Sequence, residues 1–268
     1  ALPSLRVDSF DSEFAQDARK ISLTFAPEAG SQRLRDVINK DITEDEIVTA
    51  AESAFDIGYS AVKLYFMLGL PTETDDDLRA IRRIVDLIKS AYGRKKRAKA
   101  LRVSVSVSTF IPKPFTPFQR EKQCGEAEVE AKQKVLRDCL YIKGVTLSWS
   151  DYFTSRLEGV FARGDRKLSA VLERAYKLGC TFDGWTKLLK KDCWAQAFAD
   201  CGIDPDIYLG ERAKDELLAW EFIDIGITKQ FFERERERAY AGVVTGSCKA
   251  GCAGCGLQTL CPAAKGER

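Results

Sequence analysis

Four cysteines crowd into the end of the chain, at Cys248, Cys252, Cys255 and Cys261. The first three have the spacing Cys-x3-Cys-x2-Cys, and the glycines among them let the backbone wrap tightly. Three or four thiolates in such a segment can hold a 4Fe–4S cluster or a tetrahedral zinc ion. The tail is therefore predicted to bind a metal. A 4Fe–4S cluster is favoured, structural zinc is the alternative, and unmetallated cysteines are the third interpretation.

The remaining cysteines are scattered and are expected to be small buried hydrophobic residues. The total of nine is odd, and the first residues lack the basic and apolar regions of an export signal. A cytoplasmic location and metal ligation are therefore favoured over disulfide bonds. The scattered cysteines are Cys124, Cys139, Cys180, Cys193 and Cys201.

The composition excludes several classes of function. The chain contains no histidine, which rules out His-based triads, His general bases and His-ligated metals. Its net charge is only +2, and no apolar run is long enough to cross a membrane, so no membrane partner is predicted. The basic segment 94–97 is interpreted as a solvated loop, with RNA contact as the alternative. The alternating charges at 233–238 predict an exposed helix face.

A carboxylate, Glu28, stands where a predicted strand meets a turn, in the segment 27–32 (Pro-Glu-Ala-Gly-Ser-Gln). It could accept hydrogen bonds from the ammonium group or the ribose hydroxyls of a ligand. Gly30 permits close approach of the backbone, and the helix that follows offers free N–H groups. A helix-capping acid without a ligand is the competing interpretation.

Lys63 and Tyr65 alternate with Val62 and Leu64 along a predicted strand, so they share one face. A lysine inside a barrel needs a partner or a ligand, because burying an unpaired ammonium is costly. If this face lines a lumen, both residues belong to a binding site. The strand leads into the turn 69–74 (Gly-Leu-Pro-Thr-Glu-Thr), which could equally be a simple strand-to-helix connection.

The elements that must position these residues alternate between strand and helix. Such alternation implies parallel pairing, with the chemistry at the C-terminal ends of the strands. The fold class is therefore α/β, as part of an open βα-barrel or of a doubly wound sheet. Strands are predicted near 5–7, 21–26, 61–67 and 101–110, and helices over 11–20, 41–58 (with a capping box of Thr43 and Glu46) and 74–93, the last with a buried stripe of Leu78, Ile81, Val85 and Ile88.

After residue 120 the pattern becomes mostly helical, and a boundary is placed near 143. The predicted domains are 1–142 for the βα-portion, 143–244 for a helical extension and 245–268 for the cysteine-rich tail. The elements predicted in the second half are helices over 126–141, 165–178, 186–201 and 228–241 and one strand at 145–149.

Three turns in order give the chain a family resemblance. They are Glu-x-Gly-Ser at 28–31, Gly-Leu-Pro-Thr-Glu-Thr at 69–74 and Ser-Thr-Phe-Ile-Pro-Lys-Pro at 108–114. Together they resemble the radical S-adenosylmethionine (SAM) superfamily. The similarity is to its methylthiotransferase- and elongator-like branch, and within it to a poorly characterised group with an N-terminal cobalamin-binding domain. The resemblance implies strands three to six of a partial TIM-type βα-barrel.

In that family, a Cys-x3-Cys-x2-Cys loop after the first barrel strand holds the 4Fe–4S cluster that binds SAM. The chain starts at Ala1 without that loop, so it is expected to be an inactive fragment of a radical SAM enzyme, with the tail as an auxiliary metal site. The resemblance also implies cobalamin in the missing domain, an electron donor such as flavodoxin or ferredoxin, and a small molecule or RNA as the substrate.

The resemblance assigns SAM-binding roles residue by residue. Two positions depart from the family pattern: Arg120 stands where Trp is usual, and Ser150 where His is usual. The rival hypothesis is a non-catalytic RNA- or protein-binding module that carries zinc or a cluster. The residues assigned to the SAM side of the cleft are Glu28, Ser31, Lys63 and Tyr65, with Gly69 and Pro71 shaping its floor.

Overall fold

The computed structural model describes residues 22–95, 99–248 and 250–257. The predicted strand at 5–7, the predicted helix at 11–20 and Cys261 lie outside them. The chain forms two compact units. The first comprises Ala1–Phe110, Cys124–Ser150 and Thr228–Arg268, and the second comprises Ile111–Gln123 and Asp151–Ile227. The predicted boundary near 143 falls within the first unit.

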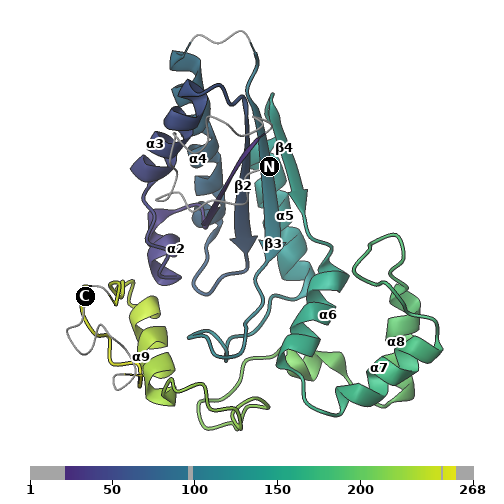
Figure 1. The fold of residues 1–268 in the computed structure, drawn as a ribbon. Coiled ribbons are helices and arrows are strands. Elements are labelled where there is room, and N and C mark those ends of the chain that lie inside the picture. The colour runs from purple at the N-terminus through teal and green to yellow at the C-terminus, as the bar shows by residue number, and fades with distance from the viewer. Residues whose placement is uncertain (1–21, 96–98, 249, 258–268) are drawn as a thin grey trace. The chain divides into compact units, whose positions relative to one another are not determined.

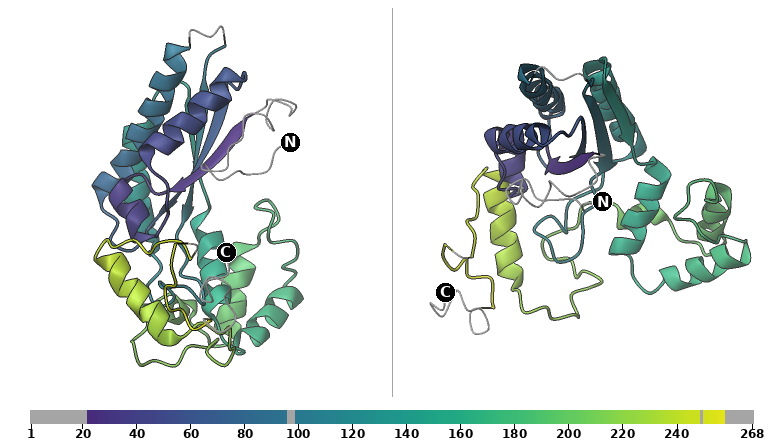
Figure 2. Two further views of the ribbon diagram at one scale, coloured as in Figure 1. Left: turned by 60° about the vertical axis from the view of Figure 1, so that its left-hand side comes forward. Right: turned by 45° about the horizontal axis from the view of Figure 1, so that its top comes forward.

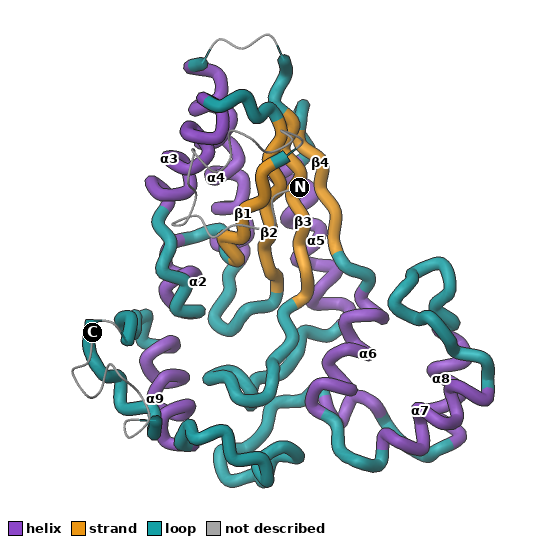
Figure 3. Tube along the Cα trace, viewed as in Figure 1, coloured by secondary structure: helices purple, strands orange, loops and turns teal. Residues whose placement is uncertain are grey.

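A four-stranded parallel sheet is the centre of the first unit (Figures 1 and 3). Its strands are β1 (Leu23–Glu28), β2 (Ala61–Leu68), β3 (Arg102–Thr109) and β4 (Val145–Trp149). The mixed α/β class and the parallel pairing are confirmed. The spatial order follows the chain order, β1-β2-β3-β4. The strand at 145–149, which the sequence analysis set apart in a helical extension, is the fourth strand of this sheet.

The helices of the first unit are α2 (Gln32–Val37), α3 (Glu44–Asp56), α4 (Asp75–Arg94), α5 (Glu126–Leu140) and α9 (Lys229–Tyr240). Helices α3 and α4 lie along one side of the strands (Figure 2). Helix α3 begins with the predicted capping box, in which the Thr43 hydroxyl accepts from the Glu46 N–H and the Glu46 carboxylate accepts from the Thr43 N–H. The predicted stripe of α4 is buried.

The two faces of the sheet differ in chemistry. Strand residues that point toward the helices are apolar and almost fully buried, as for Phe25, Leu64 and Val105. The alternate residues point the other way and are half-buried or exposed. Within the described residues no helix covers this second face of the sheet, which we call the helix-free face. Parallel sheets are usually covered on both faces and apolar throughout, so its polar side chains are unusual. The residues of this helix-free face are Thr24, Lys63, Tyr65, Met67, Ser104, Ser106, Ser108, Thr146 and Ser148.

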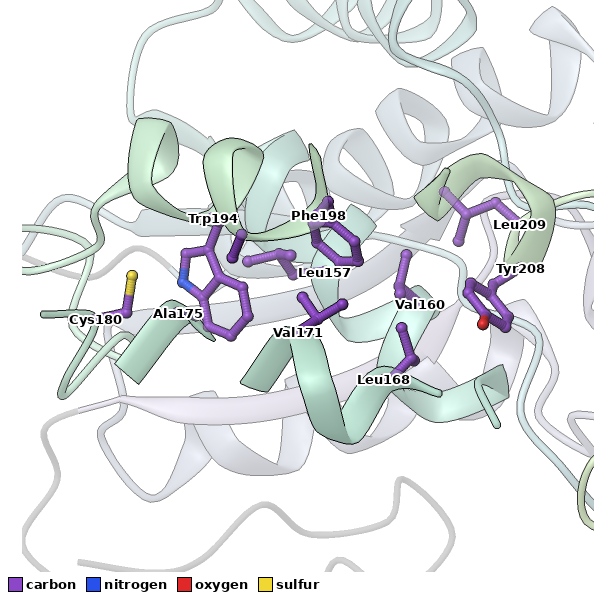
Figure 4. Packing of buried hydrophobic residues seen from close by; sticks show 11 residues of the cluster. Leu157, Val160, Leu168, Val171, Ala175, Cys180, Trp194, Phe198, Tyr208 and Leu209 are labelled. Atoms are coloured by element: carbon purple, nitrogen blue, oxygen red, sulfur yellow. The ribbon is translucent and has the colours of Figure 1, made fainter. Parts of the chain in front are cut away.

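The second unit is built from α6 (Tyr152–Arg163), α7 (Leu168–Lys177), α8 (Lys191–Asp200) and a short 3-10 helix, η2 (Pro205–Tyr208). Its core is a separate hydrophobic cluster (Figure 4). Sequence analysis missed α6, because Gly159 interrupts its pattern. A side chain at 159 would meet the buried Gln123, so this glycine serves close packing. The cluster is formed chiefly by Leu157, Val160, Leu168, Val171, Trp194, Phe198, Tyr208 and Leu209.

The scattered cysteines behave as expected in part. Cys124 and Cys180 are buried, as small hydrophobic residues would be. The other three, Cys139, Cys193 and Cys201, are half-buried.

The helices of the described part of the chain are too short or too polar to cross a membrane. The start of the basic segment is engaged with α3: Arg94 pairs with Glu52, and Lys95 pairs with Asp56 at 2.7 Å. These ion pairs agree with the interpretation of residues 94–95 as ordinary solvated surface.

Candidate functional site at the strand ends

The turns that follow β1 and β2 lie at the same edge of the sheet, because the two strands are parallel neighbours. Glu28, the last residue of β1, stands opposite Phe66 of β2. The side chain of Tyr65 therefore projects from the helix-free face at almost the same level as Glu28. Lys63 stands opposite Thr24, roughly 10 Å farther back along the sheet at 3.3 Å per residue. The structure thus brings Glu28 and Tyr65 together at the strand ends and places Lys63 deeper.

Both turns contain residues in the left-handed region of backbone conformation. Glu28 has φ = 66°, Thr72 has φ = 65°, and Gly69 has φ = 80°. For a residue with a side chain this conformation costs roughly 1–2 kcal/mol. Strained residues of this kind concentrate at binding and catalytic sites, where the surrounding structure holds them in place.

A buried carboxylate, Asp77 of α4, ties the two turns together. It accepts hydrogen bonds from the Ser31 hydroxyl and the Arg33 guanidinium on the β1 side. It also accepts from the N–H and the hydroxyl of Thr74, both at 2.8 Å. Arg33 in turn donates to the Thr72 carbonyl at 2.9 Å. The hydroxyl of Ser31, a predicted SAM ligand, is thus part of the contact between the two turns. It also caps α2 by accepting a hydrogen bond from the Leu34 N–H.

The network sets the protonation of Asp77. Burial alone would raise the pKa of this carboxyl, but hydrogen bonds from Arg33 and Ser31 outweigh it. The resulting pKa is about 2, against an ordinary value of 3.8. The charged form is therefore the one that joins the turns.

A second set of hydrogen bonds, donated by Arg35, holds the turn after β1. The Arg35 guanidinium is fully buried and donates to the carbonyls of Ala29, Gly30 and Ile42 at 3.0–3.1 Å. Burial lowers the pKa of Arg35. Gly30 has no room for a side chain: a Cβ there would lie 2.3 Å from the Asp77 carbonyl oxygen. The turn is consequently pressed against α4 and held in one conformation.

The turn after β2 is held by Glu73, whose side chain is 1% exposed. Its carboxylate accepts from the Gly69 N–H at 2.9 Å and pairs with Lys132 at 2.8 Å. Burial raises the pKa of Glu73, and the bond from Lys132 opposes that rise. Pro71 is buried within the same turn. Gly69 and Pro71 therefore belong to a fixed loop at the strand end. Their assignment to the floor of a SAM site remains a prediction from the family resemblance.

The polar side chains of the helix-free face surround Lys63 with hydroxyl groups, since its register neighbours are Thr24 and Ser104. Within the part of the chain that the structure describes, the side chains of Lys63 and Tyr65 make no ion pair or hydrogen bond. Tyr65 is 40% exposed. Glu28, by contrast, pairs with Lys40 at 3.3 Å, with about 30% of each side chain exposed. Its carboxylate therefore has a cation partner and remains open to a ligand.

The two positions that depart from the family pattern have structural partners. In the second unit, Arg120 donates to the carbonyls of Ala213 and Glu216 at 2.6 and 2.9 Å and pairs with Glu221 at 3.1 Å. In the first unit, the Ser150 hydroxyl accepts from the Thr109 N–H at 3.3 Å. Ser150 therefore lies at the strand-end edge, where it joins the ends of β3 and β4.

The cysteine tail folds into a turn between two of its predicted ligands. Cys252 Sγ accepts a hydrogen bond from the Gly254 N–H at 3.4 Å, and Gly254 has φ = 67°. Backbone N–H groups aimed at sulfur suit a thiolate that binds a metal. Among the described residues, which include Cys248, Cys252 and Cys255, no three Cys, Asp or Glu side chains converge as a metal site. The described part of the tail therefore shows the turn but not the predicted metal site.

Sequence reasoning missed the residues that hold these turns, namely Arg33, Arg35, Asp77 and Glu73. Arg33, Arg35 and Asp77 stand at ordinary charged helix positions, and Glu73 stands in a turn. The partners Ser31 and Arg33 of Asp77 and the partner Lys132 of Glu73 are distant in the chain. One signal was available: a glycine directly before Ser31 predicts close contact with another element, although it does not say which one.

Comparison with known proteins gives one informative relative. No protein-family model matches the sequence, and no solved structure matches it. An uncharacterised protein from the archaeon Methanocaldococcus jannaschii is 34% identical over 208 residues. That match covers 77% of this chain and 44% of the relative, so the chain spans less than half the length of the relative.

Proposed function

We propose that this chain forms the C-terminal part of the SAM-binding barrel of a radical SAM enzyme. The observation that carries the proposal is a helix-free polar face that ends in two clamped, strained turns. The strand order supports a barrel. Consecutive parallel strands joined by crossovers of one hand place every helix on one face, as in a βα-barrel. A doubly wound sheet would instead reverse its strand order and carry helices on both faces.

In this proposal β1, β2 and β3 are the fourth to sixth strands of a partial TIM-type barrel, and the helix-free face of the sheet lines the lumen. The third strand is the one predicted near 5–7, which lies outside the described residues. Glu28 accepts hydrogen bonds from the ammonium or ribose hydroxyls of SAM. Tyr65 and Lys63 supply the wall below it. Ser31 positions the β1 turn, and Gly69 and Pro71 hold the floor.

In this proposal the radical cluster is held by the family's Cys-x3-Cys-x2-Cys loop and not by the cysteines of the tail. When bound, a 4Fe–4S cluster supplies the electron that cleaves SAM to a 5′-deoxyadenosyl radical. The proposal includes a cobalamin-binding domain, a cytoplasmic location and an electron donor such as flavodoxin or ferredoxin. The proposed substrate class, a small molecule or RNA, is inferred from the family resemblance alone.

The tail is proposed as an auxiliary 4Fe–4S site with Cys248, Cys252, Cys255 and Cys261 as ligands. Zinc is the alternative occupant, because a Cys-x2-Cys turn with an N–H bond to sulfur also suits structural zinc. Anaerobic reconstitution with iron and sulfide should give a brown protein. A colourless protein that holds one zinc per chain would show that the tail binds zinc and not a cluster.

The test of the main proposal uses a protein that comprises this chain together with an upstream Cys-x3-Cys-x2-Cys loop. After anaerobic reconstitution and reduction, it should release 5′-deoxyadenosine from SAM. Replacing the upstream cysteines by alanine should abolish that release. A reconstituted wild-type protein that holds its iron yet neither binds nor cleaves SAM would refute the proposal. A zinc-only protein that binds RNA or a protein partner would favour the non-catalytic module.

A further inference from the structure

Strand β4 pairs with β3 along one edge, and its other edge has no neighbouring strand among the described residues. The Gly144 carbonyl accepts a hydrogen bond from the Val103 N–H of β3 at 2.9 Å. At the far end of the strand, the Ser150 N–H donates to the Val107 carbonyl at 3.1 Å. In a parallel ladder, alternate residues bond to the same neighbour, so the residues between them point their backbone groups to the outer edge. These residues are Val145, Leu147 and Trp149.

The outer edge of β4 can accept another strand. Within the described residues, nothing bonds to the N–H groups of Leu147 and Trp149. Only the start of the strand is closed, because the Val145 N–H donates to the Ile142 carbonyl at 3.2 Å. A row of unbonded N–H and C=O groups is a template for pairing with a further chain.

A groove of about 590 Å³ lies along this edge, between β4 and the C-terminal end of α5. The same three residues, Val145, Leu147 and Trp149, line it with their side chains, and each of these is half-buried. Tyr141, which also lines the groove, is 92% exposed. The groove therefore offers apolar contact surface beside backbone groups that can pair.

The groove carries a cation toward each end of the strand. Arg137 lies over the Trp149 ring at 5.4 Å, at the end of β4. Lys143 stands two positions before the start of β4 and lines the groove as well. Among the described residues, the lining includes no acid, and neither cation has an ion-pair partner. The electrostatic complement of this groove is a segment with acidic side chains.

The same charges disfavour a second copy of the chain as the occupant. A twofold pairing of β4 with β4 runs the two strands in opposite directions. It would place Lys143 of each copy near Arg137 of the other. Like charges that face each other across paired strands are destabilising. An acidic segment of a different protein meets no such repulsion.

We propose that the outer edge of β4 binds an extended acidic segment of a partner protein, which adds a strand to the sheet. Its backbone pairs with Leu147 and Trp149, its apolar side chains enter the groove, and its acidic side chains pair with Arg137 and Lys143. The inference goes beyond the proposed SAM enzyme and does not rest on it, so the two can fail separately.

The experiment measures binding of a fluorescein-labelled peptide, Asp-Thr-Val-Thr-Val-Thr-Asp with blocked ends, to the 268-residue chain by fluorescence anisotropy. When this peptide is extended, its Asp and Val side chains share one face and can point into the groove. The matched peptide has Lys in place of both Asp residues. It should bind about tenfold more weakly or less, because its charges repel those of the groove.

Charge reversal in the protein tests the same contact from the other side. A double variant, Arg137→Glu with Lys143→Glu, should weaken binding of the acidic peptide by about tenfold and strengthen binding of the lysine peptide. The matched control is Lys134→Glu, an exposed position of α5 outside the groove lining, which should change either affinity by less than about twofold. Equal binding of the two peptides to the wild type, or the same loss in Lys134→Glu, would overturn the inference.

Hydrogen exchange tests the added strand itself. In the wild type, the acidic peptide should slow exchange at the Leu147 and Trp149 amides. The Thr146 and Ser148 amides face β3 and should be protected already. Leu147→Pro removes an outward N–H and should weaken peptide binding by about three- to tenfold.

Three results would overturn the strand pairing. They are the absence of peptide binding, binding that leaves the Leu147 and Trp149 amides unchanged, and a dimer in sedimentation that Leu147→Pro dissolves. The last of these would assign the edge to a second copy of the chain. Release of 5′-deoxyadenosine would still judge the SAM site in each case.

Discussion

At the scale of single residues, the candidate site combines one partly exposed carboxylate with several buried charges that hold its turn in place. The side chain of Glu28 at the end of β1 is 28% exposed, whereas Arg35 and Asp77 are almost completely buried. The Arg35 guanidinium donates hydrogen bonds to backbone carbonyls, and the Asp77 carboxylate accepts one from the Thr74 N–H. Such an arrangement holds the turn of Glu28 in place and leaves the Glu28 carboxylate accessible to a ligand.

The first prediction concerns the charge of Glu28. In the assembled enzyme, Glu28→Gln should weaken SAM binding by about 1.5–3 kcal/mol, because one charged hydrogen bond is lost. Isothermal titration calorimetry of the reconstituted protein measures this effect. Lys40→Gln removes the ion-pair partner and serves as a control that should change affinity far less. Unchanged affinity in Glu28→Gln would remove Glu28 from the site.

Asp77 predicts a specific dependence of stability on pH. Its pKa is about 2 in the folded chain and 3.8 ordinarily, so its contribution is present above about pH 4 and is lost as pH falls toward 2. The lost stability is about 2 kcal/mol. Urea unfolding between pH 5 and pH 2.5 should show the difference between wild type and Asp77→Asn shrinking with acidity.

The control for this titration is Asp76→Asn, since Asp76 is 91% exposed on the same turn of helix. Its difference from the wild type at pH 5 should be much smaller than that of Asp77→Asn, because Asp76 makes only a surface ion pair with Arg79. A gap between the wild type and Asp77→Asn that is the same at pH 5 and pH 2.5 would show that the Asp77 network does not stabilise the charged form.

The sequence could place Glu28, Gly69 and Pro71 in turns at the ends of strands, because turn chemistry is local. It could not identify Asp77 as the link between the turns, since its partners Ser31 and Arg33 lie more than forty positions away. Nor could the sequence predict the distance between Lys63 and Glu28 along the strand direction. That distance depends on the register of β1 against β2, which includes an irregularity between Phe25 and Glu28.

At the scale of elements, the tightest packing in the candidate site is that of the turn after β1 against helix α4. Gly30→Ala would place a Cβ 2.3 Å from the Asp77 carbonyl oxygen and 2.6 Å from the Ile81 nitrogen, both backbone atoms of α4. The backbone of a packed helix cannot move aside, so we expect a loss of about 2–3 kcal/mol in the free energy of unfolding.

The matched substitution is Gly93→Ala, within the last turn of α4, where the new Cβ would meet no atom within 4 Å beyond the helix's own neighbouring residues. Alanine favours helix over glycine, so this change should stabilise the chain by up to about 1 kcal/mol. Chemical denaturation of the two variants checks both signs. Equal stability of Gly30→Ala and the wild type would mean that the turn does not pack on α4 as described.

Element prediction succeeded where local patterns dominate. The capping box of α3, the buried stripe of α4 and the limits of β4 all follow from short-range spacing. It failed at α6, where Gly159 lowers helix propensity but is required by close packing against Gln123. Membership of β4 in the sheet was also missed, because pairing with β3 is a long-range choice.

At the scale of the whole molecule, each compact unit has its own core. The chain passes between the units at residues 110–111, 123–124, 150–151 and 227–228. The second unit packs around Trp194 and Phe198, and the first around the sheet and its helices. We therefore expect the two cores to lose their structure in separate steps.

Trp194→Ala tests this expectation. Trp194 is 6% exposed, and removing a buried tryptophan side chain costs about 3–5 kcal/mol. Hydrogen exchange should accelerate in α7 and α8 while α4 keeps its protection. The reciprocal variant Val105→Ala, in a fully buried position of β3, should affect α4 and spare α8. Uniform acceleration in either variant would show one cooperative structure instead.

The left-handed conformation of Glu28 implies a conflict between stability and binding at one position. Glycine would adopt φ = 66° without steric cost, so Glu28→Gly should keep or raise the free energy of unfolding, by up to about 1 kcal/mol, despite losing the pair with Lys40. The same change removes the only carboxylate of the turn. A variant that is at least as stable as the wild type but no longer retains SAM would show that selection for a ligand, not for folding, keeps an acid where the backbone favours glycine.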